Sequence, residues 1–153
     1  MPGIDLFEVL LLLGRPAAGK SEILDFLRKV DGKTRLEKYH IGKLDVIDDF
    51  PMLWTWFEED RVLEEMGYPR LHTDADGYFK DPYLWNVLIR RISLEYEKLS
   101  RDLTGDETVL VEFSRGSEHG GYRTAFDHLS SKIVKQSAIL YIDVSYEESL
   151  RKN

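Results

Sequence analysis

The chain has 153 residues, a net charge of −7, 42% hydrophobic residues and no cysteine. This length suits one domain with its own core, and the negative charge argues against a surface that binds nucleic acid. Without cysteine there are no disulfides or thiolate metal sites, and no apolar run is long enough to span a membrane. We therefore expect a single cytoplasmic domain that has neither a nucleic-acid partner nor a membrane anchor.

The chain opens with a strand, a glycine-rich loop and a helix. Residues 7–13 form a nearly continuous apolar run, which is typical of a strand buried on both faces of a parallel sheet. Residues 21–30 have the apolar spacing of an amphipathic helix, with Ile23, Leu27 and Val30 on one stripe. The loop between them fits the pattern G-x-x-x-x-G-K-[ST] with the residues Gly14, Arg15, Pro16, Ala17, Ala18, Gly19, Lys20 and Ser21.

This loop predicts a binding site for nucleotide phosphates. Backbone N–H groups of a glycine loop and of the following helix N-terminus converge on a phosphate, because both carry positive partial charge. Lys20 would then reach the β- and γ-phosphates, and the Ser21 hydroxyl would join the shell of a magnesium ion. The alternative is an ordinary glycine turn between a strand and a helix.

The middle of the chain is less regular. After a turn at residues 31–33, a second strand lies within residues 39–47, either as Tyr39–Gly42 or as Leu44–Ile47 followed by the acidic pair Asp48-Asp49. We expect a helix over residues 55–66, which Gly67 and Pro69 end, and a long helix over residues 81–103. The apolar residues of the long helix follow helical spacing: Trp85, Leu88, Ile89, Ile92, Tyr96 and Leu99.

The last third alternates strands and helices again. We expect a further buried strand over residues 108–113, a flexible polar loop over residues 116–121, a helix over residues 122–135 and another strand over residues 137–143. Ser145 and Glu148 fit a capping box that begins a final helix. Alternating units of this kind predict a mostly parallel sheet covered by helices.

Several charged residues follow the predicted strands. Glu112, at the end of its strand, would hold a magnesium-bound water near the phosphates, or it is a solvent-facing carboxylate. Asp48 or Asp49 would accept the proton of an acceptor hydroxyl, or this pair caps a helix, with Asp45 as the substitute if the earlier strand is correct. Arg115 would neutralise a phosphate or an acidic substrate group, or it is a surface arginine.

Aromatic residues and histidines have more ordinary interpretations. The aromatic residues of the middle region would stack a planar substrate or belong to the core: Trp54, Trp56, Phe57, Tyr78 and Phe79. None of the histidines has a partner at the spacing of a zinc site, so we interpret all four as structural or exposed: His40, His72, His119 and His128. Arg90 and Arg91 are expected on a solvated helix face.

The glycine loop, Asp48-Asp49-Phe50 and Glu112-Phe113-Ser114-Arg115 together resemble the P-loop kinases of nucleosides, nucleotides and other small molecules. The acidic-aromatic motif resembles that of uridine-kinase-like members, and Phe113-Ser114-Arg115 resembles the aromatic-x-arginine motif of adenylate-kinase-like members. The resemblance implies a three-layer α/β P-loop NTPase fold with strand order 2-3-1-4. It also implies ATP and Mg²⁺ as cofactors and a small-molecule acceptor.

The sequence departs from these kinases at its end. Only Arg151 and Lys152 correspond to the arginine-bearing lid, and the fifth strand is missing, so we expect a shortened version of a longer protein. A non-catalytic nucleotide-binding module is therefore an alternative. A switch or motor NTPase is another, although the chain has no Asn-Lys-x-Asp guanine reader and no correctly placed Asp-x-x-Gly.

Overall fold

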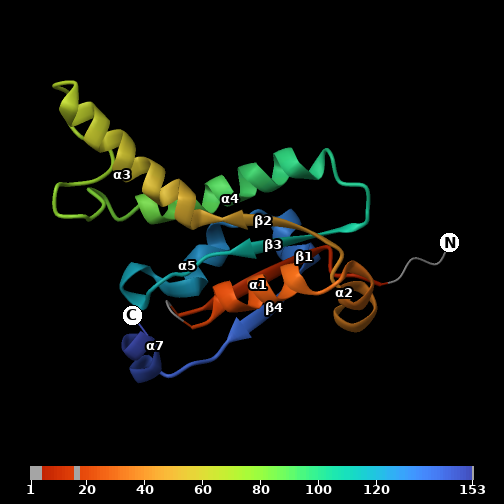
Figure 1. Ribbon diagram of the computed structural model, residues 1–153. Helices are drawn as coiled ribbons and strands as arrows, with labels where there is room; N and C mark the ends of the chain where they lie inside the picture. The colour runs from red at the N-terminus through yellow and green to blue at the C-terminus, as the bar shows by residue number, and fades with distance from the viewer. Residues whose placement is uncertain (1–4, 16–17, 153) are drawn as a thin grey trace.

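The computed structural model describes residues 5–15 and 18–152, and its centre is a four-stranded sheet (Figure 1). The strands are β1 (Val9–Gly14), β2 (Lys43–Asp48), β3 (Glu107–Glu112) and β4 (Ser137–Ile142). All pair in parallel in the order β2-β3-β1-β4, which confirms the expected order. The carboxyl ends of the strands therefore meet at one edge of the sheet.

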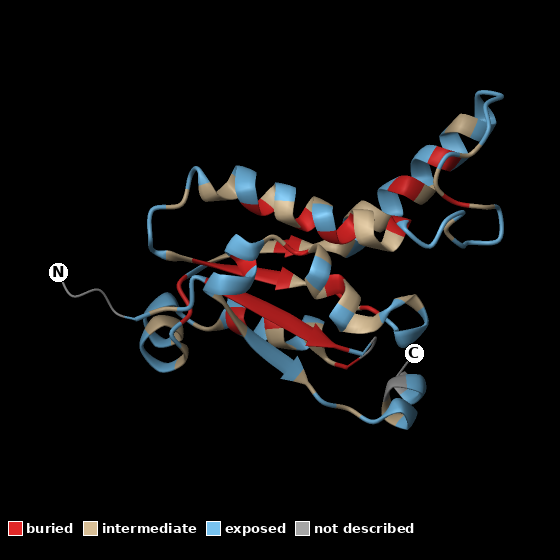
Figure 2. Ribbon diagram, turned by 180° about the vertical axis from the view of Figure 1, so that it is seen from behind, coloured by how far each residue is buried: buried red, intermediate tan, exposed pale blue. Residues whose placement is uncertain are grey.

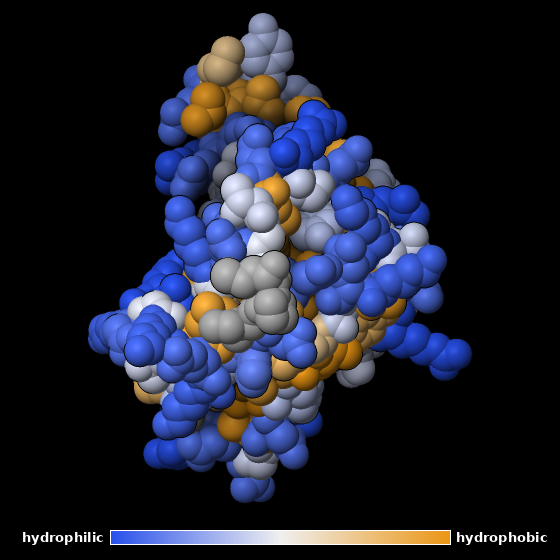
Figure 3. Space-filling view, turned by 90° about the vertical axis from the view of Figure 1, so that its right-hand side faces the viewer, coloured by the Kyte–Doolittle hydropathy of each residue, from blue (hydrophilic) through white to orange (hydrophobic). Residues whose placement is uncertain are grey.

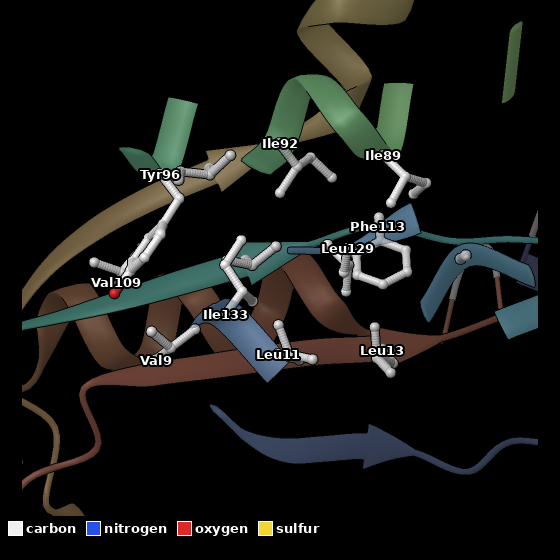
Figure 4. Close-up of a cluster of buried hydrophobic side chains, with 13 residues drawn as sticks. Val9, Leu11, Leu13, Ile89, Ile92, Tyr96, Val109, Phe113, Leu129 and Ile133 are labelled. Atoms are coloured by element: carbon white, nitrogen blue, oxygen red, sulfur yellow. The ribbon is translucent and has the colours of Figure 1, made fainter. Parts of the chain in front are cut away.

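The two faces of the sheet are covered by different helices, so the domain has three layers. β1 is buried along its whole length because its alternate side chains enter two separate cores. Val9, Leu11 and Leu13 point toward α4 (Leu84–Ser100), with α5 (Gly121–His128) and α6 (Ser131–Gln136) completing that layer (Figure 4). Leu10 and Leu12 pack on the other face, against α1 (Lys20–Lys29).

The sheet is unevenly buried along its width. β1 and β3 are mostly buried, whereas β4 at the edge exposes Ile139, Leu140 and Tyr141 (Figure 2). The final helix α7 (Tyr146–Lys152) follows β4, and the Ser145 hydroxyl accepts a hydrogen bond from the Glu148 N–H at 3.1 Å. This bond confirms the predicted N-cap.

One predicted element is wrong in kind, and another is divided in two. The turn at residues 31–33 begins a helix, α2 (Gly32–Tyr39), because the Asp31 carboxylate caps it by accepting from the Thr34 N–H at 3.0 Å. This helix has no buried residue, so the sequence carries no apolar stripe to reveal it. The helix expected over residues 122–135 is two helices, because Leu129 and Ser130 are extended and the Ser130 hydroxyl caps α6.

Other elements differ in their limits. β2 adopts the later of the two alternatives and ends at Asp48. α3 (Asp49–Glu65) begins six residues before the predicted helix, because Asp48 caps it and Pro51 lies in its first turn, where no N–H partner is required. α4 is shorter than expected at both ends, and the loop after β3 contains a short 3₁₀ helix, η1 (Ser117–His119).

In the part of the chain that the structure describes, no helix combines the length and the apolar character that a membrane span requires.

Candidate functional site

The candidate site lies where β1, β2 and β3 end. β1 leads into the glycine-rich loop, and the register pairs Glu112 with both Leu12 of β1 and Asp48 of β2. Side chains that follow these strands therefore meet at one edge. This shared edge brings together the loop, the acidic pair and Glu112, as the strand positions in the sequence predict.

The described part of the loop turns directly into α1. The Ala18 N–H donates to the Arg15 carbonyl at 3.1 Å, and Gly19 has a φ of 109°, a left-handed conformation that favours glycine. Arg15 is exposed, and its guanidinium carbon lies 5.5 Å from the centre of the Tyr146 ring in α7. Two residues of the predicted phosphate loop, Pro16 and Ala17, lie outside the described residues.

Lys20, the first residue of α1, points back toward the end of β1. Its ammonium donates to the Gly14 carbonyl at 3.2 Å and to the Ser114 hydroxyl. The Gly14 carbonyl also accepts from the Ser114 hydroxyl at 3.0 Å and from the Tyr122 hydroxyl at 2.9 Å. The loop, the segment after β3 and the start of α5 are therefore joined at a single carbonyl oxygen.

Three carboxylates act on this ammonium. Burial lowers the pKa of Lys20, and the negative charges of Glu112, Asp49 and Asp48 oppose that change. Burial and the neighbouring Asp48 also raise the pKa of Asp49 to about 7, although Lys20 opposes the shift. Burial, followed by Asp48, raises the pKa of Glu112. The site thus gathers three carboxylates around one ammonium, and the Arg28 guanidinium also acts on Glu112.

The two aspartates of the acidic pair have different hydrogen-bond partners and different electrostatic environments. The Asp48 carboxylate accepts from the Phe50 N–H at 2.9 Å and caps α3, so the helix-cap interpretation is correct for Asp48. Asp49 has the strongly raised pKa and acts electrostatically on both Lys20 and Arg115. Asp45 lies in the middle of β2, away from this edge.

The two predicted metal ligands differ in position. Ser21 is exposed in the first turn of α1, whereas Glu112 is half-buried at the end of β3. Among the described residues, no three histidine, aspartate or glutamate side chains are grouped as a metal cage. Mg²⁺ commonly uses only one or two carboxylates and completes its shell with water and phosphate oxygens. Glu112 with Ser21 is compatible with that mode of binding.

Arg115 is not a surface residue, because only 7% of it is exposed. Its Nε donates to the His119 carbonyl at 2.7 Å, and its Nη2 donates to the Asn86 side-chain oxygen at 2.6 Å. Its Nη1 is buried and has no hydrogen-bond partner among the described residues. Burial lowers the pKa of Arg115, and Asp49 opposes that shift. The guanidinium therefore joins the end of β3 to η1 and to the start of α4.

The aromatic residues belong partly to the core and partly to a row of rings beside Arg115. Trp56 is buried and stacks on His72 with 4.8 Å between ring centres. Phe79 contacts Trp85 at 4.6 Å, and Trp85 stacks on His119 at 4.5 Å. Trp54 and Tyr78 are exposed.

The histidines make structural contacts, as predicted. His72 and His119 stack on tryptophan rings. His40 contacts the Asp5 carbonyl through its ring, and His128 accepts from the Arg90 side chain at 3.0 Å.

Sequence reasoning missed three residues of this site. Ser114 stands inside the segment after β3 but has no role assigned from the sequence. Tyr122 is 108 positions from its partner Gly14, and Asn86 is 29 positions from its partner Arg115. No local pattern marks Tyr122 or Asn86, because their contacts arise only when α5 and α4 pack beside β3.

Comparison with known proteins identifies no family. The sequence matches no protein-family model and no curated protein. Two solved structures are similar in outline, each at 15% identity: APE1195, with a TM-score of 0.47, and the Pnkp1/Rnl/Hen1 RNA repair complex, with a TM-score of 0.46. The match to APE1195 covers 97% of this chain and 67% of that chain. The match to the RNA repair complex covers 99% of this chain and 38% of that chain.

Proposed function

We propose that this protein transfers a phosphoryl group from ATP, bound with Mg²⁺, to a hydroxyl or phosphate of a small molecule. One observation carries the proposal. The ammonium of Lys20 begins the helix after a glycine loop, and it lies within the electrostatic reach of Glu112, Asp48 and Asp49 at one sheet edge. Phosphoryl transfer depends mainly on positioning and on neutralising charge, and this edge supplies groups for both.

The residues present fit a nucleotide with its metal ion. The left-handed Gly19 directs the loop into the N-terminus of α1, where backbone N–H groups attract phosphate. A divalent cation that binds beside Asp49 and Glu112 would favour their charged forms, which burial and the negative charge of Asp48 disfavour. When bound, ATP with Mg²⁺ supplies the transferable phosphoryl group and shields its charge.

Each residue then has a role of its own. Residues 14–21 hold the phosphates through the loop backbone, and the Lys20 ammonium exchanges its present partners for phosphate oxygens. Ser21 and Glu112 hold the metal ion. Asp49 is the better candidate to accept the acceptor's proton, because its pKa is raised to about 7 while Asp48 is engaged as a helix cap.

Arg115 and the rings beside it border the place where an acceptor would lie. The guanidinium is fixed by two hydrogen bonds and keeps one buried nitrogen without a partner among the described residues. Because this nitrogen is buried, an acidic group of the acceptor would reach it only after the covering side chains move. The stacked Trp85 and His119 rings offer a flat surface for a planar group.

The test separates binding from catalysis. Titration calorimetry with Mg²⁺ and ATP should show binding to the wild-type protein, and a panel of nucleosides, nucleotides and metabolites should include one that stimulates ADP release. Lys20→Ala should weaken ATP binding at least about tenfold and abolish turnover. Lys29→Ala, at the exposed end of the same helix, should behave like the wild type.

Two results would count against the proposal in different ways. Binding without acceptor-dependent ADP release would favour a non-catalytic nucleotide-binding module. Unchanged ATP affinity in the Lys20→Ala variant would remove the loop itself from the site.

A further inference from the structure

The second feature of interest is an arm that projects from the domain at the edge where the candidate site lies. The arm comprises residues 55–83, which include most of α3 and the segment that returns to α4. The distal part of α3 extends beyond the sheet and its covering helices (Figures 1 and 2). A projecting element of this kind exposes side chains that the sheet does not cover.

The arm is held together internally, so it is a shaped surface rather than a loose loop. The buried Asp60 carboxylate accepts from the N–H groups of Leu71, His72 and Thr73 at 2.9, 3.0 and 2.6 Å. It also accepts from the Thr73 hydroxyl at 2.7 Å. These bonds fasten the returning segment to the helix at residues 71–73.

A groove of about 480 Å³ runs between α3 and this fastened segment. Its lining is mainly apolar, with two glutamates at its border: Thr55, Glu58, Glu59, Val62, Leu63 and Leu71. Val62 is 47% exposed and Leu71 is 63% exposed, and the neighbouring Met66 and Tyr68 are exposed as well. In Figure 3, where the arm is at the top, hydrophobic side chains lie next to hydrophilic ones. The groove thus combines an apolar floor with an acidic border.

The charge of the arm is strongly one-sided. Residues 55–83 contain eight acidic and three basic residues. Arg70 pairs with Glu64 at 2.9 Å and Lys80 donates to the Arg70 carbonyl. The third basic residue, Arg61, is exposed on α3. Glu58 and Glu59 are exposed and form no ion pair with any described residue. The border of the groove is therefore negative and open to a positively charged partner.

We propose that this groove binds a basic amphipathic peptide segment of another protein, with an apolar side chain between α3 and Leu71 and flanking Lys or Arg beside Glu58 and Glu59. Apolar burial would supply affinity, and the charges would set orientation and partner choice. The negative border repels nucleic acid and anionic lipid. A second copy of a chain with net charge −7 is repelled too. The inference is independent of the proposed phosphoryl transfer.

The probe is a synthetic peptide of about 18 residues, long enough for a stable helix, with leucines on one face and lysines on the other. A leucine–glutamate peptide and a scrambled leucine–lysine peptide serve as comparisons. Binding is measured by fluorescence anisotropy, and the contact region is mapped by amide chemical shifts. We expect binding of the leucine–lysine helix alone, with shifts concentrated in residues 55–71.

Three variants with exposed substitutions separate specific docking from general attraction. Glu58→Gln with Glu59→Gln should weaken binding about fivefold, and Val62→Ser with Leu71→Ser should weaken it at least as much. Glu37→Gln with Glu97→Gln removes the same charge from exposed positions on α2 and α4, and it should have little effect.

Several results would overturn the proposal. The leucine–lysine helix fails to bind, or the scrambled peptide binds equally well. Alternatively, the control variant loses as much peptide affinity as the Glu58 and Glu59 variant, or the Val62 and Leu71 changes leave the affinity unchanged. Reversible self-association through the groove, detected by sedimentation and lost in the Val62 and Leu71 variant, would identify a second copy as the occupant instead.

Discussion

The hydroxyl of Tyr122 forms hydrogen bonds with both backbone polar groups of Gly14. The Gly14 N–H donates to the hydroxyl at 3.0 Å, and the hydroxyl donates to the Gly14 carbonyl at 2.9 Å. Burial raises the pKa of Tyr122, so the phenol keeps its proton at neutral pH. A residue of α5 thus fixes the point where β1 ends and the glycine loop begins.

Tyr122→Phe should weaken nucleotide binding about three- to tenfold, because the loop loses its fixed starting point. The ring would keep its packing against Phe113, Phe126 and Tyr141, so the melting temperature should fall by only a few degrees. Calorimetric titration and thermal unfolding measure the two effects separately.

Tyr141→Phe is the matched control, because it removes a hydroxyl from a ring in the same cluster. Its nucleotide affinity should equal that of the wild type. An equal loss of nucleotide affinity in both variants would assign Tyr122 a structural role only. A large fall in the melting temperature of the Tyr122→Phe variant would do the same.

Asp49 should make the ligand-free protein less stable as the pH rises. Its pKa of about 7 in the folded protein lies above the value of about 3.9 in an unfolded chain, so the folded state holds the proton more tightly. Its contribution to the free energy of unfolding is therefore complete below about pH 4 and lost as the pH rises through about 7. The loss should reach about 2 kcal/mol, after allowance for partial solvent exposure.

Asp49→Asn should remove this dependence. The free energy of unfolding of the wild type and the variant is measured by urea unfolding between about pH 5 and about pH 8. This interval covers roughly the range over which Asp49 titrates. The variant should be the more stable of the two at the upper pH. Parallel curves for the two proteins would show that Asp49 ionises as it does in an unfolded chain.

Asp60→Asn should release the returning segment of the arm. Burial favours a raised pKa for Asp60, but hydrogen bonds from Thr73, Leu71 and His72 outweigh it and lower the pKa to about 2. The stabilisation is therefore present above about pH 4 and is lost as the pH falls through about 2. An amide cannot accept all these bonds, so the variant should lose about 2–3 kcal/mol.

Amide hydrogen exchange of residues 67–83 reports directly whether the returning segment of the arm is released. Protection should fall in this segment, whereas residues of β1 and β3 should keep theirs in mild conditions. Asp76→Asn, an exposed change in the same segment, should leave exchange as it is in the wild type. Unchanged exchange in the Asp60→Asn variant would mean that other contacts hold the arm.

The sequence by itself determined the parallel sheet and the sheet edge at which the candidate site lies. The apolar runs of β1 and β3 could be interpreted without a structure because strands buried on both faces admit few polar residues. The loop from Gly14 to Ser21 and the residues after β2 and β3 were predicted from their order along the chain, since parallel strands carry their carboxyl ends to one edge.

Only the tertiary structure decided which side chains share that edge with Lys20. The division of the acidic pair into a helix cap at Asp48 and a carboxylate of raised pKa at Asp49 depends on burial, which local sequence does not record. The contact of Tyr122 with Gly14 spans 108 positions. Contacts of this separation arise from helix packing against the sheet, so no spacing rule along the chain contains them.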